Sequence, residues 1–355
     1  MSLNTALIGV GRMGAEPSAR FENQIPDGWL PISHAESIQT TPGLNLIALC
    51  DVSELRLRQC AEHYGVKKLY SDYRVLIDKV RPEVLSIATR TNIRCDVIRY
   101  GLENGVKGFY AEKPFSNTLK DCRETLAKIE QHGAKIVYGT TRRAMDVYKK
   151  AKQICWSGEL GDIREISLEF GRSPLLWTLP HATDLITYFA DSTDVEFIQG
   201  YCTMDDNTST NYLIIDCDPI VENAFFKFSN GISATINQGG VLNVRIFCSK
   251  GNLTVHGNGY NIEINRIKQF KDYFHSIEEI KVESIKSGTQ YMMEDLANSI
   301  SFNTPVKIIK PKEIFCGQQL LVGILESTLR GGARVSPSDL NDDLYITGRN
   351  GANFA

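Results

Sequence analysis

The chain has 355 residues, of which 42% are hydrophobic and 23% are charged, and its formal net charge is −3. This length allows two domains, each with a substantial hydrophobic core. A nucleic-acid-binding protein would need clustered basic residues, and a membrane-spanning helix would need roughly 20 consecutive apolar residues. The sequence has neither, so we expect neither nucleic acid nor a membrane among its partners.

The N-terminus lacks the basic region of a secretory signal peptide. The nine cysteines are scattered along the chain without a CxxC pair. Such cysteines are typical of reduced thiols rather than of a disulfide framework or a zinc site. The sequence therefore predicts a cytoplasmic protein with no metal centre.

A short strand is expected over residues 5–10, and it runs into the motif GVGRMG, which supplies Gly9, Gly11, Arg12, Met13 and Gly14. In this G-x-G-x-x-G spacing the first glycine permits a tight turn, the second lets the backbone approach a pyrophosphate, and the third allows close helix packing. The phosphates would lie on backbone N–H groups at the start of a helix. The motif therefore predicts a dinucleotide-binding site.

A second strand is expected over residues 44–50 and ends at Asp51, the residue type that binds the ribose in such sites. Asp51 lies much further along the chain than the usual spacing of about 20 residues. Residues 15–33 are rich in turn-forming residues, and we interpret them as a loop insertion of undetermined role that explains the excess.

Asp51 favours NAD as the cofactor. NADP is the alternative, because Arg12 and Arg56 are available for a 2′-phosphate. A different interpretation of Asp51 is that it caps the helix expected to begin at residue 53.

Strands and helices alternate through the first 140 residues. Further strands are expected at 83–89, 106–112 and 134–139, with helices at 53–63, 72–80, 92–104 and 119–131. This pattern predicts a doubly wound, mostly parallel sheet of six strands, five of which are the ranges given above, and this is the architecture of a Rossmann domain. We assign residues 1–140 to this NAD(P)-binding domain.

The strand at 106–112 ends in Glu112-Lys113-Pro114. Proline cannot continue the hydrogen-bond ladder, so the strand stops here. Glu112 and Lys113 are therefore expected at the carboxyl end of a central strand, where open α/β sheets bind ligands. The alternative is a surface ion pair.

The second half, residues 141–355, is predicted to form an α+β domain with a large, mostly antiparallel open sheet. The evidence is a set of alternating runs at 163–170, 195–203, 211–216 and 223–228, hairpin signals at Asn230-Gly231 and Lys250-Gly251, and helices at 146–156, 289–302 and 311–330. We expect the helices on one face. The other face must be covered, so we expect a homodimer or homotetramer through the open sheet.

His181 and Asp184 lie one turn apart on a helix that is expected to follow Pro180, so both side chains share one face. Imidazole titrates near neutrality, and a carboxylate can fix its tautomer, so the pair suits a general base. A purely structural hydrogen bond at a helix start is the alternative.

Together the motifs GVGRMG, SIAT, AEKP and PHATDLITYF resemble the Gfo/Idh/MocA oxidoreductases, named for glucose–fructose oxidoreductase and inositol dehydrogenase, over nearly the whole chain. The resemblance implies a Rossmann domain plus an open-sheet domain, NAD(P) dependence and a sugar-like or cyclitol substrate. It implies that Lys113 is the catalytic lysine, which reaches both the substrate hydroxyl and the nicotinamide ribose, and that His181 is the general acid–base. It also implies that Asp184 is the acidic residue found three places after that histidine. Ala88 and Thr89 match the loop beside the nicotinamide, and Glu112 the residue that accompanies the lysine.

Two positions depart from the family pattern. Trp177 stands where many members have an aspartate, and Arg90 interrupts a T-P-N-x-x-H pattern, so both are candidate substrate-binding residues. Arg142 and Arg143 follow the last Rossmann strand, where an arginine near a helix start favours a neutralising anion. We consider that Arg90, Arg142 or Arg143 meets a carboxylate or phosphate of the substrate, against the alternative of salt bridges between domains.

The expected function is hydride transfer between nicotinamide and a secondary alcohol of a sugar, sugar acid, nucleotide-sugar or cyclitol. Lys113 would orient and polarise the hydroxyl, and His181 would exchange its proton. Two alternatives remain open on the same scaffold: an NAD-retaining glycosidase, and a nucleotide-sensing regulator without catalysis.

Overall fold

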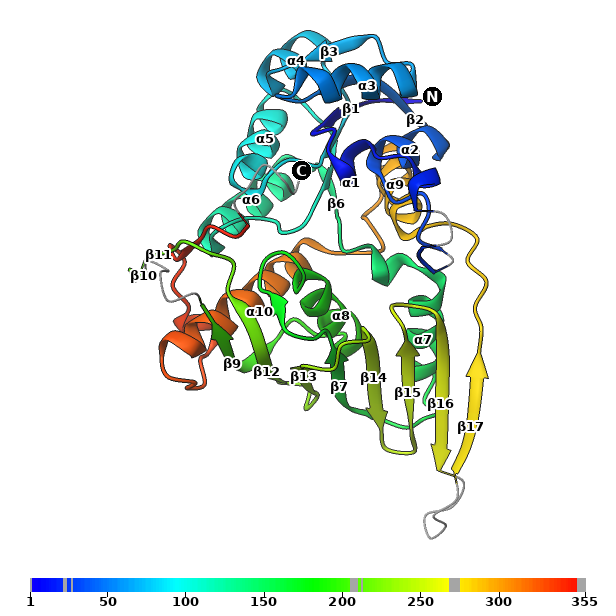
Figure 1. Cartoon of the computed structure of the whole chain (residues 1–355), viewed down its shortest axis with the longest axis vertical. Coiled ribbons are helices and arrows are strands. Elements are labelled where there is room, and N and C mark those ends of the chain that lie inside the picture. The colour runs from blue at the N-terminus through cyan, green and yellow to red at the C-terminus, as the bar shows by residue number, and fades with distance from the viewer. Residues whose placement is uncertain are drawn as a thin grey trace.

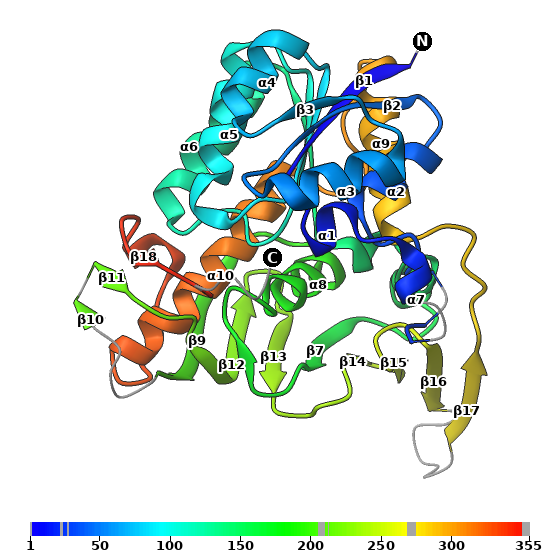
Figure 2. The ribbon, with the colours of Figure 1, turned by 45° about the horizontal axis from the view of Figure 1, so that its top comes forward.

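The computed structural model describes residues 2–21, 24–26, 28–204, 210–211, 213–267 and 275–349. Two sheets lie at opposite ends of the molecule, with helices between and around them (Figures 1 and 2). The N-terminal part of the chain forms the upper sheet in Figure 1, and the second half forms the larger, lower sheet.

The N-terminal sheet has six strands in the order β3-β2-β1-β4-β5-β6, and every pair is parallel. The strands are β1 (Leu3–Ile8), β2 (Leu44–Cys50), β3 (Lys68–Tyr70), β4 (Val84–Ile87), β5 (Gly108–Ala111) and β6 (Lys135–Tyr138). All residues of β4 and β5 are buried, as expected for strands covered on both faces. The predicted doubly wound sheet is confirmed, and its strand order reverses between β1 and β4, where such sheets bind ligands.

The helices of this part are α1 (Arg12–Ala15), α2 (His34–Thr40), α3 (Glu54–Tyr64), α4 (Tyr73–Val80), α5 (Thr91–Glu103) and α6 (Leu119–Gln131). Side-chain caps help to set where they begin: Ser53 accepts the backbone N–H of Arg56, and Thr118 accepts that of Asp121. Helix α1 is a single turn. The chain then passes through the predicted insertion, which contains the 3-10 turn η1 (Ser18–Arg20), before α2 begins.

The second sheet has nine strands in the order β17-β16-β15-β14-β7-β13-β12-β8, with β9 also paired to β12. The strands are β7 (Ile163–Glu169), β8 (Ser173–Pro174), β9 (Val195–Thr203), β12 (Ile220–Phe228), β13 (Ser233–Asn237), β14 (Asn243–Cys248), β15 (Gly251–His256), β16 (Asn261–Ile267) and β17 (His275–Ile280). Every pair except β7–β13 is antiparallel. The predicted open, mostly antiparallel sheet is therefore confirmed.

The turns of two hairpins agree with their sequence signals. Gly231, between β12 and β13, has a φ of +89°, a left-handed conformation that glycine adopts without strain. The turn at Lys250 joins β14 to β15. The single strand predicted at 211–216 is wrong. Instead, β10 (Thr210–Asn211) and β11 (Ile214–Ile215) form a small separate sheet with β18 (Tyr345–Ile346) from the C-terminal tail.

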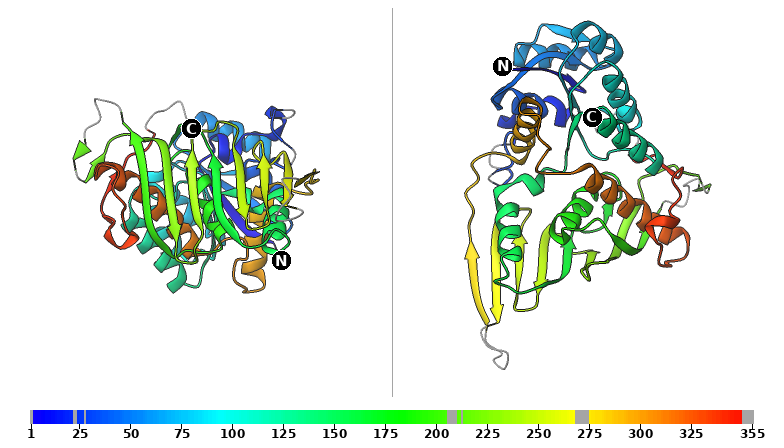
Figure 3. Two further views of the ribbon diagram at one scale, coloured as in Figure 1. Left: turned by 90° about the horizontal axis from the view of Figure 1, so that it is seen from below. Right: turned by 180° about the vertical axis from the view of Figure 1, so that it is seen from behind.

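Three helices cover one face of the large sheet: α7 (Asp146–Trp156), α8 (Pro180–Ala190) and α10 (Pro311–Leu329). They lie between this sheet and the N-terminal part of the chain (Figure 1). No helix of the described residues covers the other face, which is in front in the left view of Figure 3. The predicted homodimer or homotetramer through this face stays a prediction.

Helix α9 (Gly288–Ser301) belongs to the second half of the sequence but packs against the N-terminal sheet. Its Met292, Met293 and Leu296 are fully buried. A Cβ atom at Gly108 of β5 would lie 2.4 Å from Ile300 Cδ1, so a larger residue there would force the Ile300 side chain of the helix to move. Residues from both predicted domain ranges, 1–140 and 141–355, therefore share this core.

Within the described residues, no helix is long and apolar enough to cross a membrane. In the same part of the chain, no group of three or more His, Cys, Asp or Glu side chains is arranged to hold a metal ion. All nine cysteines belong to it, and none of them forms a disulfide.

Candidate active site

A cavity of about 1120 Å³ lies where the two parts of the chain meet. The glycine turn after β1 and the carboxyl ends of β2, β4 and β5 form one side, and the start of α8, the segment before β12 and the C-terminal tail form the other. Most of the predicted site residues line this cavity: Gly9, Gly11, Arg12, Met13, Asp51, Ala88, Thr89, Arg90, Glu112, Lys113, Arg142, Trp177 and His181. Gly14, Arg143 and Asp184 are not part of its lining.

The glycine turn leaves no room for side chains. Gly9 has a φ of +91°, and a Cβ atom there would lie 2.7 Å from the backbone carbonyl of Ala88. A Cβ atom at Gly14 would lie 2.0 Å from the carbonyl oxygen of Gly9. Both positions therefore require glycine, and the bare backbone beside the cavity is suited to contact a pyrophosphate.

Asp51 holds this turn against the second strand. Its Oδ2 accepts the N–H of Val10 at 2.8 Å, and its Oδ1 accepts the N–H of Ser53 at 2.8 Å. The N-cap of α3 is Ser53, so the interpretation of Asp51 as the capping residue is wrong. Asp51 lines the cavity, and so do Arg12 and Arg56.

Glu112 lies in a buried hydrogen-bond network beneath the cavity. Its side chain is 6% exposed, and its Oε1 lies 3.1 Å from Nε2 of His34, whose Nδ1 lies 2.7 Å from Ser86 Oγ. The interpretation of Glu112 and Lys113 as a surface ion pair is wrong, because the glutamate is inside the protein. A Cβ atom at Gly139 would lie 2.7 Å from Glu112 Oε1, so glycine is needed to admit the carboxylate.

The network keeps Glu112 ionised. Burial alone would raise the pKa of its carboxyl, but the hydrogen bond from His34 and the charges of Lys113 and Arg94 outweigh burial and lower that pKa. Its Oε2 also accepts the backbone N–H of Lys113 at 3.2 Å. Glu112 therefore holds the backbone of the lysine in place.

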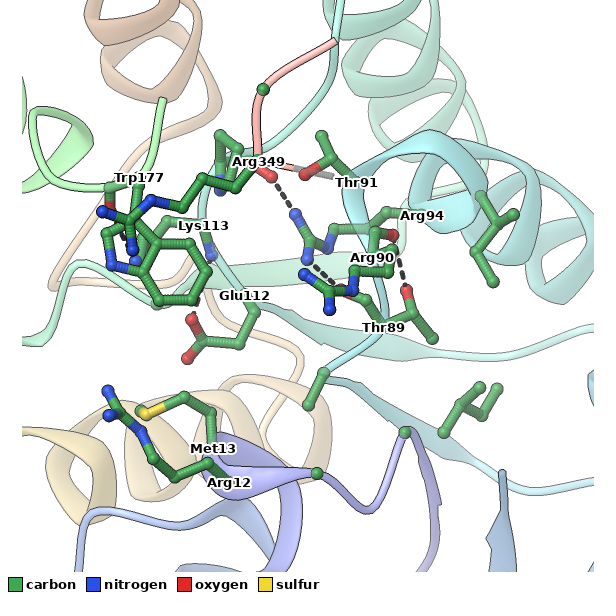
Figure 4. Close-up of a pocket in the computed structure, with 18 of the residues that line it drawn as sticks. Arg12, Met13, Thr89, Arg90, Thr91, Arg94, Glu112, Lys113, Trp177 and Arg349 are labelled. Carbon is green, nitrogen blue, oxygen red and sulfur yellow. Dashed lines mark hydrogen bonds between the residues drawn. The ribbon is translucent and has the colours of Figure 1, made fainter. Parts of the chain in front are cut away.

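The side chain of Lys113 reaches across the cavity to the second part of the chain. Its Nζ donates to the carbonyl oxygen of Trp177 at 2.6 Å and lies 4.5 Å from the centroid of the indole ring. Figure 4 shows Lys113 and Trp177 together, opposite Arg12 and Met13 of the glycine turn. Burial lowers the pKa of Lys113 to about 8; Glu112 opposes this shift, and the charge of Arg142 adds to it.

His181 is the second residue of α8, directly after Pro180. Its Nδ1 is enclosed and has no hydrogen-bond partner among the described residues. Its Nε2 is not enclosed, so this nitrogen is the one available to the cavity. Burial, followed by the charges of Arg142 and Lys113, lowers the pKa of His181 well below its ordinary value, so the imidazole is neutral at pH 7 and can accept a proton.

The expected hydrogen bond between Asp184 and His181 is absent. Asp184 instead pairs with Arg143: Oδ2 accepts from Nε at 3.0 Å, and Oδ1 lies 2.9 Å from Nη2. Arg143 also bonds Glu313 at 2.8 Å, and its side chain is 1% exposed. The prediction that Asp184 supports the histidine is therefore wrong, because a buried guanidinium takes the carboxylate. The suggestion that Arg143 binds substrate is wrong for the same reason. Arg143 does form salt bridges, but they join residues within the range 141–355 and not the two predicted domains.

Of the residues that line or support the cavity and were not predicted from the sequence, the following four contact predicted site residues. Asp218 accepts the backbone N–H groups of Leu176 and Trp177 at 2.7 and 3.0 Å, and so fixes the segment that receives Lys113. The guanidinium of Arg349 lies 5.0 Å from the Trp177 ring centroid and extends along it in Figure 4. The other two are Trp29, from the insertion, and His34. None of the four has a local sequence signature that marks it as part of a site.

Comparison with known proteins identifies the N-terminal part of the chain. Residues 3–140 match the GFO_IDH_MocA model, described as an oxidoreductase family with an NAD-binding Rossmann fold. The chain is 27% identical over 157 residues to the uncharacterized oxidoreductase YrbE of Bacillus subtilis, covering 44% of this chain and 41% of that protein. It is 26% identical over 159 residues to myo-inositol 2-dehydrogenase of Thermotoga maritima, covering 45% and 42%. The chain thus spans about two fifths of the length of these curated relatives.

The fold extends over nearly the whole chain. The structure of levoglucosan dehydrogenase in complex with NADH and levoglucosan is similar with a TM-score of 0.75, over 95% of this chain and 99% of that one, at 14% sequence identity. At this identity the likeness establishes the fold alone. Residues 3–140, which form the six-stranded parallel sheet and its helices, therefore match a family described as having an NAD-binding Rossmann fold.

Proposed function

We propose that this chain, which begins with an NAD-binding Rossmann domain of an oxidoreductase family, is a dehydrogenase acting on a secondary alcohol of a sugar, sugar acid, nucleotide-sugar or cyclitol. The observation that carries the proposal is that Lys113 and His181, from different parts of the chain, line one cavity with the glycine turn. The names of the relatives, which include myo-inositol 2-dehydrogenase and D-glucoside 3-dehydrogenase, support this substrate class.

The residues at the glycine end of the cavity fit a nicotinamide dinucleotide. Gly9 and Gly14 leave the turn open to a pyrophosphate, and Asp51 provides carboxylate oxygens for ribose hydroxyls. Ala88 and Thr89 would line the nicotinamide end. When bound, this cofactor accepts or supplies the hydride.

Lys113 and His181 would divide the remaining work on the substrate. The ammonium of Lys113 donates a hydrogen bond to the substrate oxygen and stabilises the negative charge that develops there. Nε2 of His181 accepts the hydroxyl proton during oxidation and returns it to the oxygen during reduction. The carbonyl of Trp177 and the carboxylate of Glu112 hold the lysine in position.

The test of this proposal is the absorbance at 340 nm when the protein is mixed with NAD and a panel of cyclitols, glucosides, uronic acids and nucleotide-sugars. The dehydrogenase proposal requires stoichiometric NADH formation with at least one member. Cleavage of a glucoside without net NADH would favour the NAD-retaining glycosidase. NADH binding without turnover of any panel member would favour the nucleotide-sensing regulator.

The rate should depend on pH through Lys113. Because its pKa is lowered to about 8, kcat/KM should fall as the pH rises through about 8 and the ammonium loses its proton. The acidic limb should lie well below pH 6.5, because the pKa of His181 is lowered. Lys113→Arg keeps the charge and should remove the alkaline limb. An identical alkaline limb in wild type and Lys113→Arg would contradict the assignment.

Asp51→Ala should weaken NADH binding by roughly 10-fold, the scale of a lost hydrogen bond to a charged group. The substitution removes the acceptor for the N–H of Val10 as well as the expected ribose contact. Titrations followed by NADH fluorescence measure the change. The carboxylate of Asp51 repels the 2′-phosphate of NADPH, so Asp51→Ala should raise the affinity for NADPH relative to the affinity for NADH. An unchanged ratio of the two affinities would count against Asp51 as the ribose-binding residue.

A further inference from the structure

Two adjacent arginines, Arg142 and Arg143, are equally deep in the protein but differ in how their charges are neutralised. Counting backbone and side chain together, Arg142 is 7% exposed and Arg143 is 2% exposed. Arg143 is paired with Asp184 and Glu313. Arg142 forms no ion pair within the described part of the chain, although burying a charge is costly unless a partner compensates it.

The direct contacts of Arg142 are with neutral groups; the charge of Asp184 also acts on it, but that carboxylate is paired with Arg143. Its Nε donates to Oδ1 of Asn258 at 2.7 Å. Its Nη1 is enclosed and has no acceptor among the described residues, and the phenol of Tyr148 lies beside the guanidinium. The guanidinium carbon lies 4.9 Å from the ring centroid of Trp29 and 5.8 Å from that of Phe170. Aromatic faces hold the guanidinium in place without cancelling its charge.

Arg142 lines the cavity near the proposed reacting groups. The positive charge of Arg142 contributes to lowering the pKa of both His181 and Lys113, and all three residues line the cavity. Arg142 is therefore close enough to both groups to affect their charge states. The phosphates of a dinucleotide would lie at the opposite end, on the glycine turn. The cofactor phosphates would therefore not neutralise Arg142, which leaves this side of the cavity suited to a second, anionic group.

We propose that Arg142 binds an anionic oxygen group of the substrate, a carboxylate or a phosphate, so that the substrate is an acidic sugar derivative. This inference rests on the proposed function and narrows its substrate class. Arginine recognises both groups through charge-assisted hydrogen bonds. Trp29, whose Nε1 donates to the carbonyl of Asn258 at 3.3 Å, closes this end of the cavity and links the 15–33 insertion to anion recognition.

Binding to the NADH-loaded protein tests the inference without requiring turnover. D-glucuronate, D-galacturonate and D-glucose 6-phosphate serve as anionic probes, and D-glucose and D-galactose as neutral probes, with thermal stabilisation as the readout. At least one anionic probe should bind about 10-fold to 100-fold more tightly than its neutral counterpart. Preference for a uronate identifies a carboxylate, and preference for the sugar phosphate identifies a phosphate.

Arg142→Met should abolish the preference for the anion, and Arg142→Lys should retain part of it. Arg58→Gln, which removes an exposed arginine paired with Glu54 on α3, is the control and should keep the full preference. Equal binding of charged and neutral probes, no binding of any anionic probe, or an unchanged preference in Arg142→Met would overturn the inference. Failure of NADH itself to bind would instead refute the proposed function, so the two failures are distinguishable.

Discussion

Replacing Lys113 with methionine is expected to lower kcat/KM by about 10³-fold while leaving NADH affinity nearly unchanged, because a buried donor aimed at developing charge contributes on this scale. Methionine preserves the length and apolar contacts of the side chain but removes the ammonium. It also removes the hydrogen bond to the carbonyl of Trp177. Steady-state kinetics with the best substrate, together with an NADH titration of the same variant, separates the loss of chemistry from the loss of cofactor.

The matched control is Lys120→Met, at an exposed lysine whose partner is Asp343 on the surface. Exposed ion pairs contribute only about 0–1 kcal/mol to stability, so this variant should remain folded. Its kcat/KM and its NADH affinity should therefore equal those of the wild type. If Lys113→Met turned over substrate at the wild-type rate, the catalytic assignment would be refuted.

Replacing Arg143 with methionine is expected to lower the free energy of unfolding by about 3–5 kcal/mol, the effect of leaving buried charges without their partner. Arg143 joins three segments: it bonds Asp184 of α8, Glu313 of α10 and the carbonyl oxygen of Ile308. Its removal leaves the carboxylate of Asp184 buried and unpaired. Urea unfolding followed by circular dichroism measures the change in midpoint.

Two further variants identify the cause of this loss. Arg123→Met removes a half-exposed arginine that pairs with Asp342, and it should cost no more than about 1 kcal/mol. Adding Asp184→Asn to Arg143→Met should recover part of the lost stability, because the unpaired charge is then gone. If Arg143→Met lowered the free energy of unfolding no more than Arg123→Met does, the buried ion pairs would contribute little to stability.

Local patterns were sufficient to predict most of the fold. The alternation of apolar runs with capped, amphipathic segments predicted the helices within one or two residues; α7, for example, spans Asp146–Trp156 as expected. The glycine motif and the proline after Lys113 are also local signals, because each restricts the backbone at its own position. They therefore located the glycine turn and the lysine correctly at the edge of the sheet.

The errors concern partners that are distant in sequence. Helical spacing places His181 and Asp184 on one side of α8 but does not reveal which distant residue pairs with the carboxylate. That residue is Arg143, 41 positions from Asp184 in the sequence. For the same reason the two arginines after β6 were indistinguishable in the sequence. Only tertiary packing gives Arg143 two carboxylates and Arg142 none among the described residues.

The C-terminal tail was another long-range feature. Its polar, turn-rich composition gave no indication that β18 pairs with β11, yet this pairing brings Arg349 to the cavity. The strand is only two residues long, so no periodic pattern marks it.

Asp218 was not predicted for a similar reason, because it binds the backbone of a segment about forty residues earlier in the sequence.

Chemical protection by NADH tests most directly whether Lys113 and His181 share the cofactor cavity. Diethylpyrocarbonate modifies accessible imidazoles and amines, and peptide mass spectrometry reports the rate at each residue. Saturating NADH should slow the modification of Lys113 and His181 together, while the exposed His63 and His132 react at unchanged rates. Modification of Lys113 and His181 at the same rates with and without bound NADH would contradict the account.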